Sequence, residues 1–134
     1  MTKRVVITGM GIISPIGNDV PTFWKNLVDG VCGIDYIHDF PTDGLPVKIA
    51  GKIKDFHPEE HGMDKAFGRK QDRFTQYGVA AAYEAMNQAG LVSEGEGQNI
   101  DPFRLGVYVG SGIGGFEIQF RETVKMIEDP TGQW

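Results

Sequence analysis

A glycine-rich run, Gly9–Ser14, is the first stretch of the sequence that could carry chemistry. It stands between a β-branched segment and a segment of helical periodicity, which is where a dinucleotide-binding loop would lie. That fingerprint needs a third glycine for close packing of helix against strand, but Ser14 occupies the position. No acidic residue follows at the end of a second strand about 20 residues further on, where the ribose contact belongs. We therefore interpret the run as a packing turn and keep a nucleotide-binding α/β domain as a lesser alternative.

The run His57–His61 (HPEEH) matches the H-x-x-E-H pattern of a zinc peptidase family. Two histidines four residues apart on a helix could share a metal, with Glu60 as the base. Pro58, however, is tolerated only where a helix begins, and this would leave His57 outside the helix. No third ligand is evident, so we predict a solvated turn and no metal site.

Cys32 is the only cysteine in the sequence. It follows a predicted helix C-terminus, where the helix dipole disfavours a thiolate. We interpret it as a small residue packed in a turn, not as a nucleophile. A single cysteine rules out an internal disulfide and is typical of a reducing compartment.

A local basic group stands out in a chain whose formal net charge is −5. Its members are Lys65, Arg69, Lys70 and Arg73. A solvated helix start would explain them, since Asp64 and Asp72 dilute the charge. A cationic knob on an anionic surface can also steer an acidic partner. The net charge argues against a nucleic-acid partner.

The run Ser111–Gly115 (SGIGG) follows an apolar segment and exposes its backbone as an elbow. It could hold a phosphate at the N-terminus of the next helix, but no P-loop lysine follows. It could equally let a ligand chain pass close to the backbone. In that case Ile113 would be the only bulky side chain of the elbow.

The elements that would position these residues alternate between strands and helices. We predict buried strands at Arg4–Gly9 and Leu105–Gly110, which are rich in β-branched residues, and a half-exposed strand at Val47–Ile53. Helices are expected from Pro21 to Gly30, from Gln71 to Ala89 with an unusually small-sided surface, and from Phe116 to Glu128. The remaining stretches are expected to be irregular: 33–46, 55–68 with one or two short helical turns, and the polar loop 93–101.

The order of these elements predicts an α/β fold. Two buried strands cannot build a two-sided parallel sheet by themselves. We therefore expect further strands, either because the chain continues past Trp134 or because it pairs with another copy. No apolar run approaches the ~20 residues of a membrane span, and Val5–Ile7 is too short for a signal-peptide core. A cytoplasmic location is expected.

Several of these runs together resemble the bacterial type II β-ketoacyl-(acyl carrier protein) synthases, in order and spacing, over nearly the whole chain. The resemblance is carried by Arg4–Gly11, Ser14–Gly17, Trp24, Gly33-Ile34, Arg69–Phe74, Gln76–Gly78, Leu105–Val107 and Gly110–Gly115. Each motif alone is weak evidence for the family. The three main motifs, which begin at Arg4, Arg69 and Leu105, are specific for it when they occur together in this order and spacing. The small-sided helix and the glycine elbow favour the elongating type of the family.

The resemblance implies a thiolase-like fold of α-β-α-β-α layers, built from two similar halves, in a homodimer. Residues 1–134 would be the N-terminal part of the first half. The implied reaction is chain elongation in fatty acid synthesis, by decarboxylative Claisen condensation of an acyl thioester with malonyl-acyl carrier protein. It requires no organic cofactor. The alternative is a truncated, non-catalytic chain that binds acyl carrier protein or a synthase subunit.

The resemblance also assigns roles to single residues. Gly112 and Ile113 match the elbow that lines the acyl pocket, and Lys65, Arg69 and Lys70 fall in the region that docks acyl carrier protein. The catalytic cysteine and both histidines are expected beyond Trp134, so these 134 residues alone should be inactive. The cysteine and histidines that are present match no catalytic motif: Cys32, His38, His57 and His61.

Overall fold

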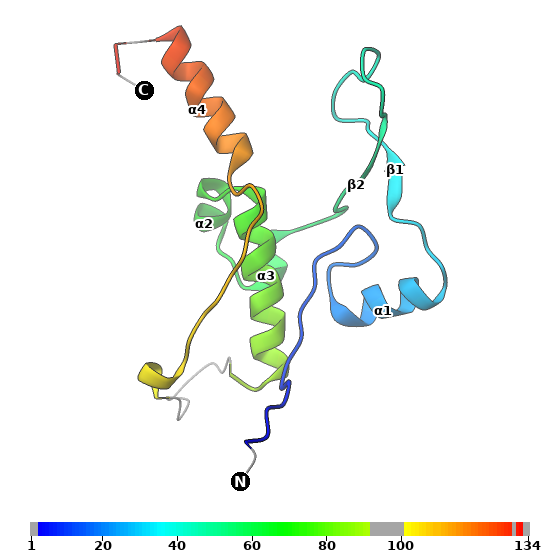
Figure 1. The fold of residues 1–134 in the computed structure, drawn as a ribbon, viewed down its shortest axis with the longest axis vertical. Coiled ribbons are helices and arrows are strands. Elements are labelled where there is room, and N and C mark those ends of the chain that lie inside the picture. The colour runs from blue at the N-terminus through cyan, green and yellow to red at the C-terminus, as the bar shows by residue number, and fades with distance from the viewer. Residues whose placement is uncertain (1–2, 92–100, 130, 133–134) are drawn as a thin grey trace.

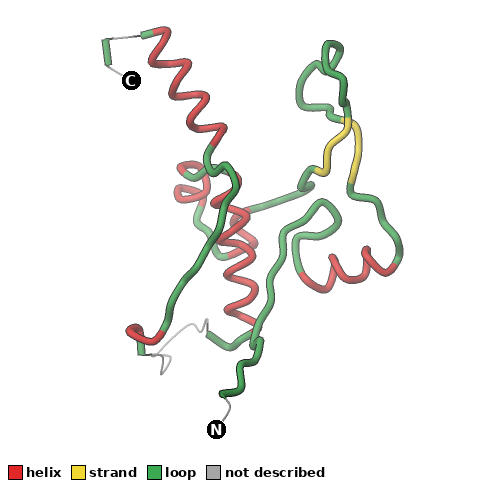
Figure 2. The backbone as a smooth tube through the Cα atoms, in the orientation of Figure 1, coloured by secondary structure: helices red, strands yellow, loops and turns green. Residues whose placement is uncertain are grey.

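The computed structural model describes residues 3–91, 101–129 and 131–132. In these ranges short elements are joined by long connections (Figures 1 and 2). The order is α1 (Val20–Val28), β1 (Ile34–Tyr36), β2 (Ile49–Gly51), the 3₁₀ turn η1 (Pro58–His61), α2 (Lys65–Lys70), α3 (Arg73–Gln88), the 3₁₀ turn η2 (Pro102–Arg104) and α4 (Phe116–Glu128). The predicted loop 93–101 lies outside the described residues except for Asp101.

The helix α3 is the central element, with α2 on one side of it, α1 on the other and α4 beyond its N-terminal end (Figure 1). The predicted helix over 71–89 is confirmed. Asp72 is the N-cap, and its carboxylate accepts the Arg73 N–H. At the other end Gly90 takes a φ of +70°, and the Leu91 N–H returns to the Met86 carbonyl in a Schellman motif.

The helix α1 forms for equally local reasons. The Asp19 carboxylate accepts the Thr22 N–H at 2.7 Å, and Pro21 lies in the first turn, where its missing N–H costs nothing. Gly30, with a φ of +71°, ends the helix as predicted, and the Val31 N–H bonds back to the Asn26 carbonyl.

The small-sided surface of α3 receives the N-terminal glycine run in close contact. A Cβ added to Gly9 would lie 2.0 Å from the Ala85 carbonyl oxygen, and one added to Gly11 would lie 1.9 Å from that of Ala81. Only glycine fits at either position. The interpretation of this run as a packing turn agrees with the contact.

Polar side chains of α3 hold the same segment. The Met10 N–H donates to the Gln88 Oε1 at 2.6 Å, and the Ile12 N–H donates to one oxygen of Glu84 at 2.9 Å. The other oxygen of Glu84 accepts the Val20 N–H at 2.7 Å. One carboxylate therefore ties the glycine run and the start of α1 to α3.

The strands differ most from prediction. β1 and β2 form an antiparallel pair in which Ile34 faces Gly51. β2 lies inside the predicted strand 47–53, but β1 lies in a stretch predicted to be irregular, so that prediction is wrong there. β1 has three residues, too few for a periodic pattern, and it becomes a strand because β2 supplies its hydrogen-bonding partner.

The predictions of buried strands at Arg4–Gly9 and Leu105–Gly110 are wrong. Both segments are extended without sheet partners, and Val5 and Tyr108 are 92% and 102% exposed. Apolar side chains on both faces of a strand are normally buried by neighbouring elements. None of the described residues covers these two segments. The elements that would make a layered sheet are absent from the described part of the chain.

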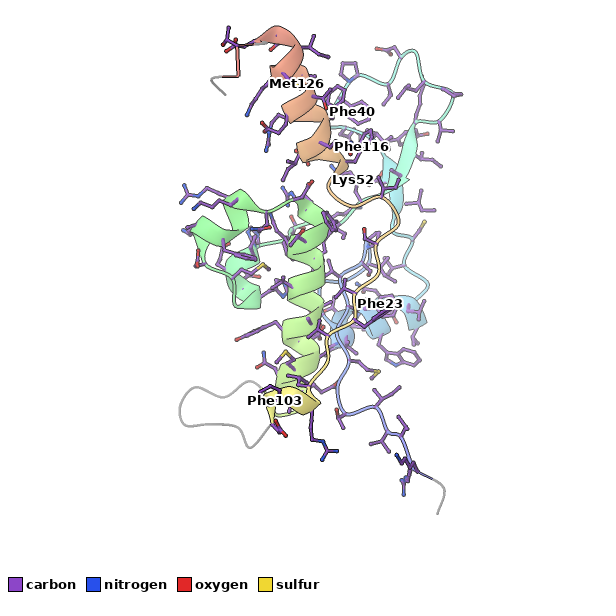
Figure 3. All side chains as sticks on the ribbon, turned by 60° about the vertical axis from the view of Figure 1, so that its left-hand side comes forward. Phe23, Phe40, Lys52, Phe103, Phe116 and Met126 are labelled. Atoms are coloured by element: carbon purple, nitrogen blue, oxygen red, sulfur yellow. The ribbon has the colours of Figure 1, made fainter. Side chains whose placement is uncertain are left out.

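The interior is correspondingly small. Met63 and Ala80 are the buried hydrophobic residues among those described. The chain exposes 11150 Å², whereas a compact monomer of 14.7 kDa would expose about 6,900 Å². Side chains such as Phe103 project freely into solvent (Figure 3). In the described ranges no helix combines the length and the apolar character needed to cross a membrane.

Candidate docking groove and glycine elbow

The short helix α2 carries all three predicted docking residues. The Asp64 carboxylate caps it by accepting the Phe67 N–H at 2.7 Å, and its buried Gly68 lies against η1, where an added Cβ would be 3.4 Å from the Pro58 ring. Arg69 and Lys70 fill its last turn, where cations complement the carbonyl end of the helix dipole. Their side chains are exposed, as is that of Lys65 in the first turn.

Gln76 fixes α2 to α3. Its buried amide nitrogen donates to the carbonyl oxygens of Gly68 at 2.7 Å and Gln71 at 2.9 Å. These carbonyls lie at the end of α2, which a six-residue helix cannot satisfy internally. The orientation of Arg69 and Lys70 is therefore set by α3.

A groove of about 570 Å³ lies between α2, the start of α3 and α4. Its lining residues are Phe56, Pro58, Glu59, Lys65, Gly68, Arg69, Gln71, Asp72, Arg73, Gln76, Glu117, Ile118 and Arg121. Lys65 and Arg69 of the three predicted docking residues line it, whereas Lys70 does not. Four cations face three carboxylates here, and Asp72 is engaged by backbone N–H groups. The groove therefore favours an anionic ligand or surface.

Sequence reasoning missed Arg121. It stands 48 positions after Arg73, on a different helix, and no local pattern marks it. Its Nε lies 3.3 Å from Glu122 Oε1, and the side chain stays 56% exposed. Glu122 also pairs with Lys125 at 3.1 Å, and Lys125 and Arg121 together lower the pKa of that carboxyl. Such exposed pairs exchange readily with an incoming anionic group.

The elbow Ser111–Gly115 forms a tight turn before α4. Ser111 Oγ accepts the Gly114 N–H at 3.0 Å, and Gly114 has a φ of +75°, which only glycine adopts without strain. Ile113 is 80% exposed, and a Cβ added to Gly112 would meet nothing within 4 Å. Both residues are open to solvent, and their role as a pocket wall stays a prediction.

Asp72 connects the groove to the elbow. Besides capping α3, its carboxylate accepts the Ile118 N–H of the first turn of α4 at 3.3 Å. A Cβ added to Gly115 would lie 2.7 Å from the Asp72 Oδ2. The end of the elbow is therefore seated directly on this carboxylate.

The histidine run and Cys32 are the other sites considered from sequence. η1 starts at Pro58 and leaves His57 outside, as predicted, while the His61 ring stacks on Phe56 at a centroid distance of 5.2 Å. Within the described ranges no three residues of metal-binding type come together. Cys32 follows α1 in a turn but is exposed, so the prediction that it is packed is wrong.

Comparison with known proteins decides the family. Residues 2–132 match the family model described as the β-ketoacyl synthase, N-terminal domain. This chain belongs to the β-ketoacyl synthase family. The resemblance inferred from the three motifs in register is thereby confirmed.

Relatives within the β-ketoacyl synthase family cover most of the chain. The 3-oxoacyl-[acyl-carrier-protein] synthase 2 of Staphylococcus aureus strain COL is 51% identical over 116 residues, which are 86% of this chain and 27% of that protein. The protein of the same name from Vibrio cholerae is 44% identical over 87% of this chain and 27% of its own length. The chain therefore spans about a quarter of these relatives.

A solved structure described as the ishigamide ketosynthase/chain length factor matches with a TM-score of 0.58 and 36% identity, over 65% of this chain and 21% of that one. With the family match, this likeness confirms the predicted fold class, α/β and thiolase-like. The described residues correspond to a fraction of that fold, which agrees with the missing sheet layers.

Proposed function

We propose that residues 1–134 are the N-terminal part of a condensing enzyme of fatty acid elongation, a 3-oxoacyl-(acyl carrier protein) synthase. The observation that carries this proposal is the identity of 44–51% to synthases of that name over 86–87% of the chain. The catalytic cysteine and the two histidines would follow Trp134. In residues 1–134 we assign no catalytic residue, no metal and no cofactor.

The proposed reaction proceeds in two stages. A cysteine thiolate attacks an acyl thioester, forms an acyl-enzyme and releases the carrier thiol, which takes up a proton. Malonyl-acyl carrier protein then loses CO₂, and the resulting enolate carbon attacks the acyl-enzyme carbonyl. The cysteine thiolate leaves, and β-ketoacyl-acyl carrier protein is the product. Histidine N–H groups would stabilise the enolate oxygen.

The groove is proposed as a docking site for acyl carrier protein, an acidic partner. Lys65, Arg69 and Lys70 would contact carboxylates of that partner, and the structure adds Arg73 and Arg121 to the same face. Because the groove uses none of the catalytic residues, it would serve the alternative function equally well. That alternative is a non-catalytic chain that binds acyl carrier protein or a synthase subunit.

Gly112 and Ile113 are proposed to line the acyl-chain pocket, which further residues of the synthase would close. The exposed apolar segments Val5–Ile7 and Val107–Val109 support a larger assembly, in which the rest of the synthase and a second copy would bury them. We therefore propose a homodimer, located in the cytoplasm. Sedimentation of the synthase at the mass of one copy would contradict the dimer.

An assay of the product of the whole gene tests the function. With an acyl-acyl carrier protein and malonyl-acyl carrier protein, we expect release of CO₂ and formation of the β-ketoacyl product in equal amounts. Residues 1–134 alone should show no turnover. A stop codon directly after Trp134 would contradict the enzymatic proposal and favour the binding alternative.

A further inference from the structure

The first turn of α3 holds two neighbouring elements through two side chains. Gln76 binds the end of α2, whereas Asp72 binds the start of α4. Both side chains are buried, with Asp72 exposed by 9% and Gln76 by 8%. The elbow Ser111–Gly115 therefore leads into a helix whose first turn is fixed to α3 by one carboxylate.

The chemistry of that contact requires an acceptor with two free oxygens. One oxygen of Asp72 accepts the Arg73 N–H at 3.0 Å, and the other accepts the Ile118 N–H at 3.3 Å. α4 has no side-chain cap of its own, because its N-cap residue, Gly115, has no side chain. Asp72 thus supplies from another helix the acceptor that a serine or aspartate at position 115 would otherwise provide.

The position of the elbow is further restricted by shape. Gly115 has a φ of −78°, which any residue adopts, so the backbone conformation does not require glycine there. The contact with Asp72 disfavours a larger residue, because an added Cβ would lie 2.7 Å from the carboxylate oxygen and would force it to move. An added Cβ at Gly114 would lie 4.0 Å from the Phe74 ring, on the same turn of α3. The elbow is therefore packed against the start of α3 at Gly115.

We propose that Asp72 is a positioning residue for acyl-chain selectivity, which acts by holding the elbow and thereby the side chain of Ile113. This inference rests on the proposed function, in which Ile113 lines the acyl-chain pocket, where a bulky side chain would limit the length of the chain that fits. Asp72 itself does not touch the substrate. Its effect is to keep the pocket wall in one place, so that chains of different length are distinguished.

Asp72→Asn in the full-length synthase tests the proposal. Asparagine keeps one oxygen for the Arg73 N–H and replaces the other with an NH₂ group, which cannot accept from Ile118. We expect the Ile118 amide to exchange with solvent about tenfold faster, as the loss of a hydrogen bond to a charged group implies. We also expect the kcat/KM ratio between octanoyl- and tetradecanoyl-acyl carrier protein to move several-fold toward one.

Two further variants keep the test decisive. Asp64→Asn makes the same change at the cap of α2, where the carboxylate accepts the Phe67 N–H, and should leave the Ile118 exchange and the kcat/KM ratio unchanged. Gly115→Ala keeps the charge and the α3 cap but pushes the carboxylate away, and should shift both readouts in the direction of Asp72→Asn.

The outcomes distinguish a failure of the positioning role of Asp72 from a failure of the proposed function. Unchanged Ile118 exchange in Asp72→Asn, or an equal loss of kcat/KM for both chain lengths, would overturn the positioning role. If the wild-type synthase turned over neither substrate, the proposed function would fail, while amide exchange would still decide whether Asp72 holds α4.

Discussion

Gly11→Ala perturbs the close packing of the glycine run against α3. The new Cβ would lie 1.9 Å from the Ala81 carbonyl oxygen, and real Cβ atoms stay at least about 3.0 Å from such an oxygen. The glycine run must therefore retreat from α3 by about 1 Å. That movement stretches the hydrogen bonds of Ile12 to Glu84 and of Met10 to Gln88 beyond a useful length.

The cost follows from those two hydrogen bonds. The one to the Glu84 carboxylate contributes about 1.5–3 kcal/mol and the one to the Gln88 amide about 0.5–1.5 kcal/mol. Alanine returns about 0.4–1 kcal/mol by restricting the unfolded chain. We therefore expect Gly11→Ala to lower the free energy of local unfolding by about 2–3 kcal/mol.

Amide hydrogen exchange of the synthase measures this loss at Met10 and Ile12, whose N–H groups make the two bonds. Gly44→Ala is the matched control, because a Cβ there meets nothing within 4 Å and its backbone φ lies outside the left-handed region. It should change the exchange of these amides by less than about 0.5 kcal/mol. Equal protection of the Ile12 amide in both variants would refute the packing argument.

Three further predictions concern the groove, the elbow and α4. Arg69→Glu should weaken binding of acyl carrier protein about tenfold at low salt. Lys25→Glu on α1, which lies on the other side of α3 from α2 (Figure 1), is the control and should leave the affinity unchanged. Equal affinities of the two variants by calorimetry would remove the docking role. Ile113→Phe should lower kcat/KM for long acyl chains and spare short ones, whereas a uniform loss would indicate misfolding. The pKa of Glu122 should lie below its ordinary value of 4.5, because Lys125 and Arg121 favour the charged form. The contribution of Glu122 to the helicity of α4 should therefore be complete above pH 4.5 and be lost at lower pH. A carbon-detected NMR titration with a midpoint at or above 4.5 would contradict this, and Lys125→Gln should raise the midpoint.

The helices could be predicted because their signals are local. Asp19 and Pro21 start α1 and Gly30 ends it, and all lie within a turn of the helix that they delimit. Asp72 and Gly90 do the same for α3. A cap acts through hydrogen bonds to its own neighbours, so its effect is readable without knowledge of the rest of the molecule.

The strands could not be predicted in the same way, because a strand depends on what lies beside it. Leu105–Gly110 has the composition of a buried strand, but its hydrogen-bonding partners are not among the described residues. β1 shows the reverse case, since three unremarkable residues pair with β2.

The candidate site shows the same division between local and distant signals. Lys65, Arg69 and Lys70 are close in sequence and could be recognised as a group. Arg121 joins the groove from α4, whose first turn bonds to Asp72 across 46 positions. The sequence revealed the cations that lie close together along the chain and missed Arg121, which has the same charge but lies far from them.

The two hydrogen bonds to Glu84 cannot form until the ribosome has synthesised that residue. Ile12 and Val20 precede their common acceptor by 72 and 64 positions. At 5–20 residues per second, they wait roughly 3–14 s before Glu84 is made. Through that interval the apolar run Val5–Ile7 has no helix to anchor its neighbours. A nascent chain is open to chaperones, and to aggregation, in that window.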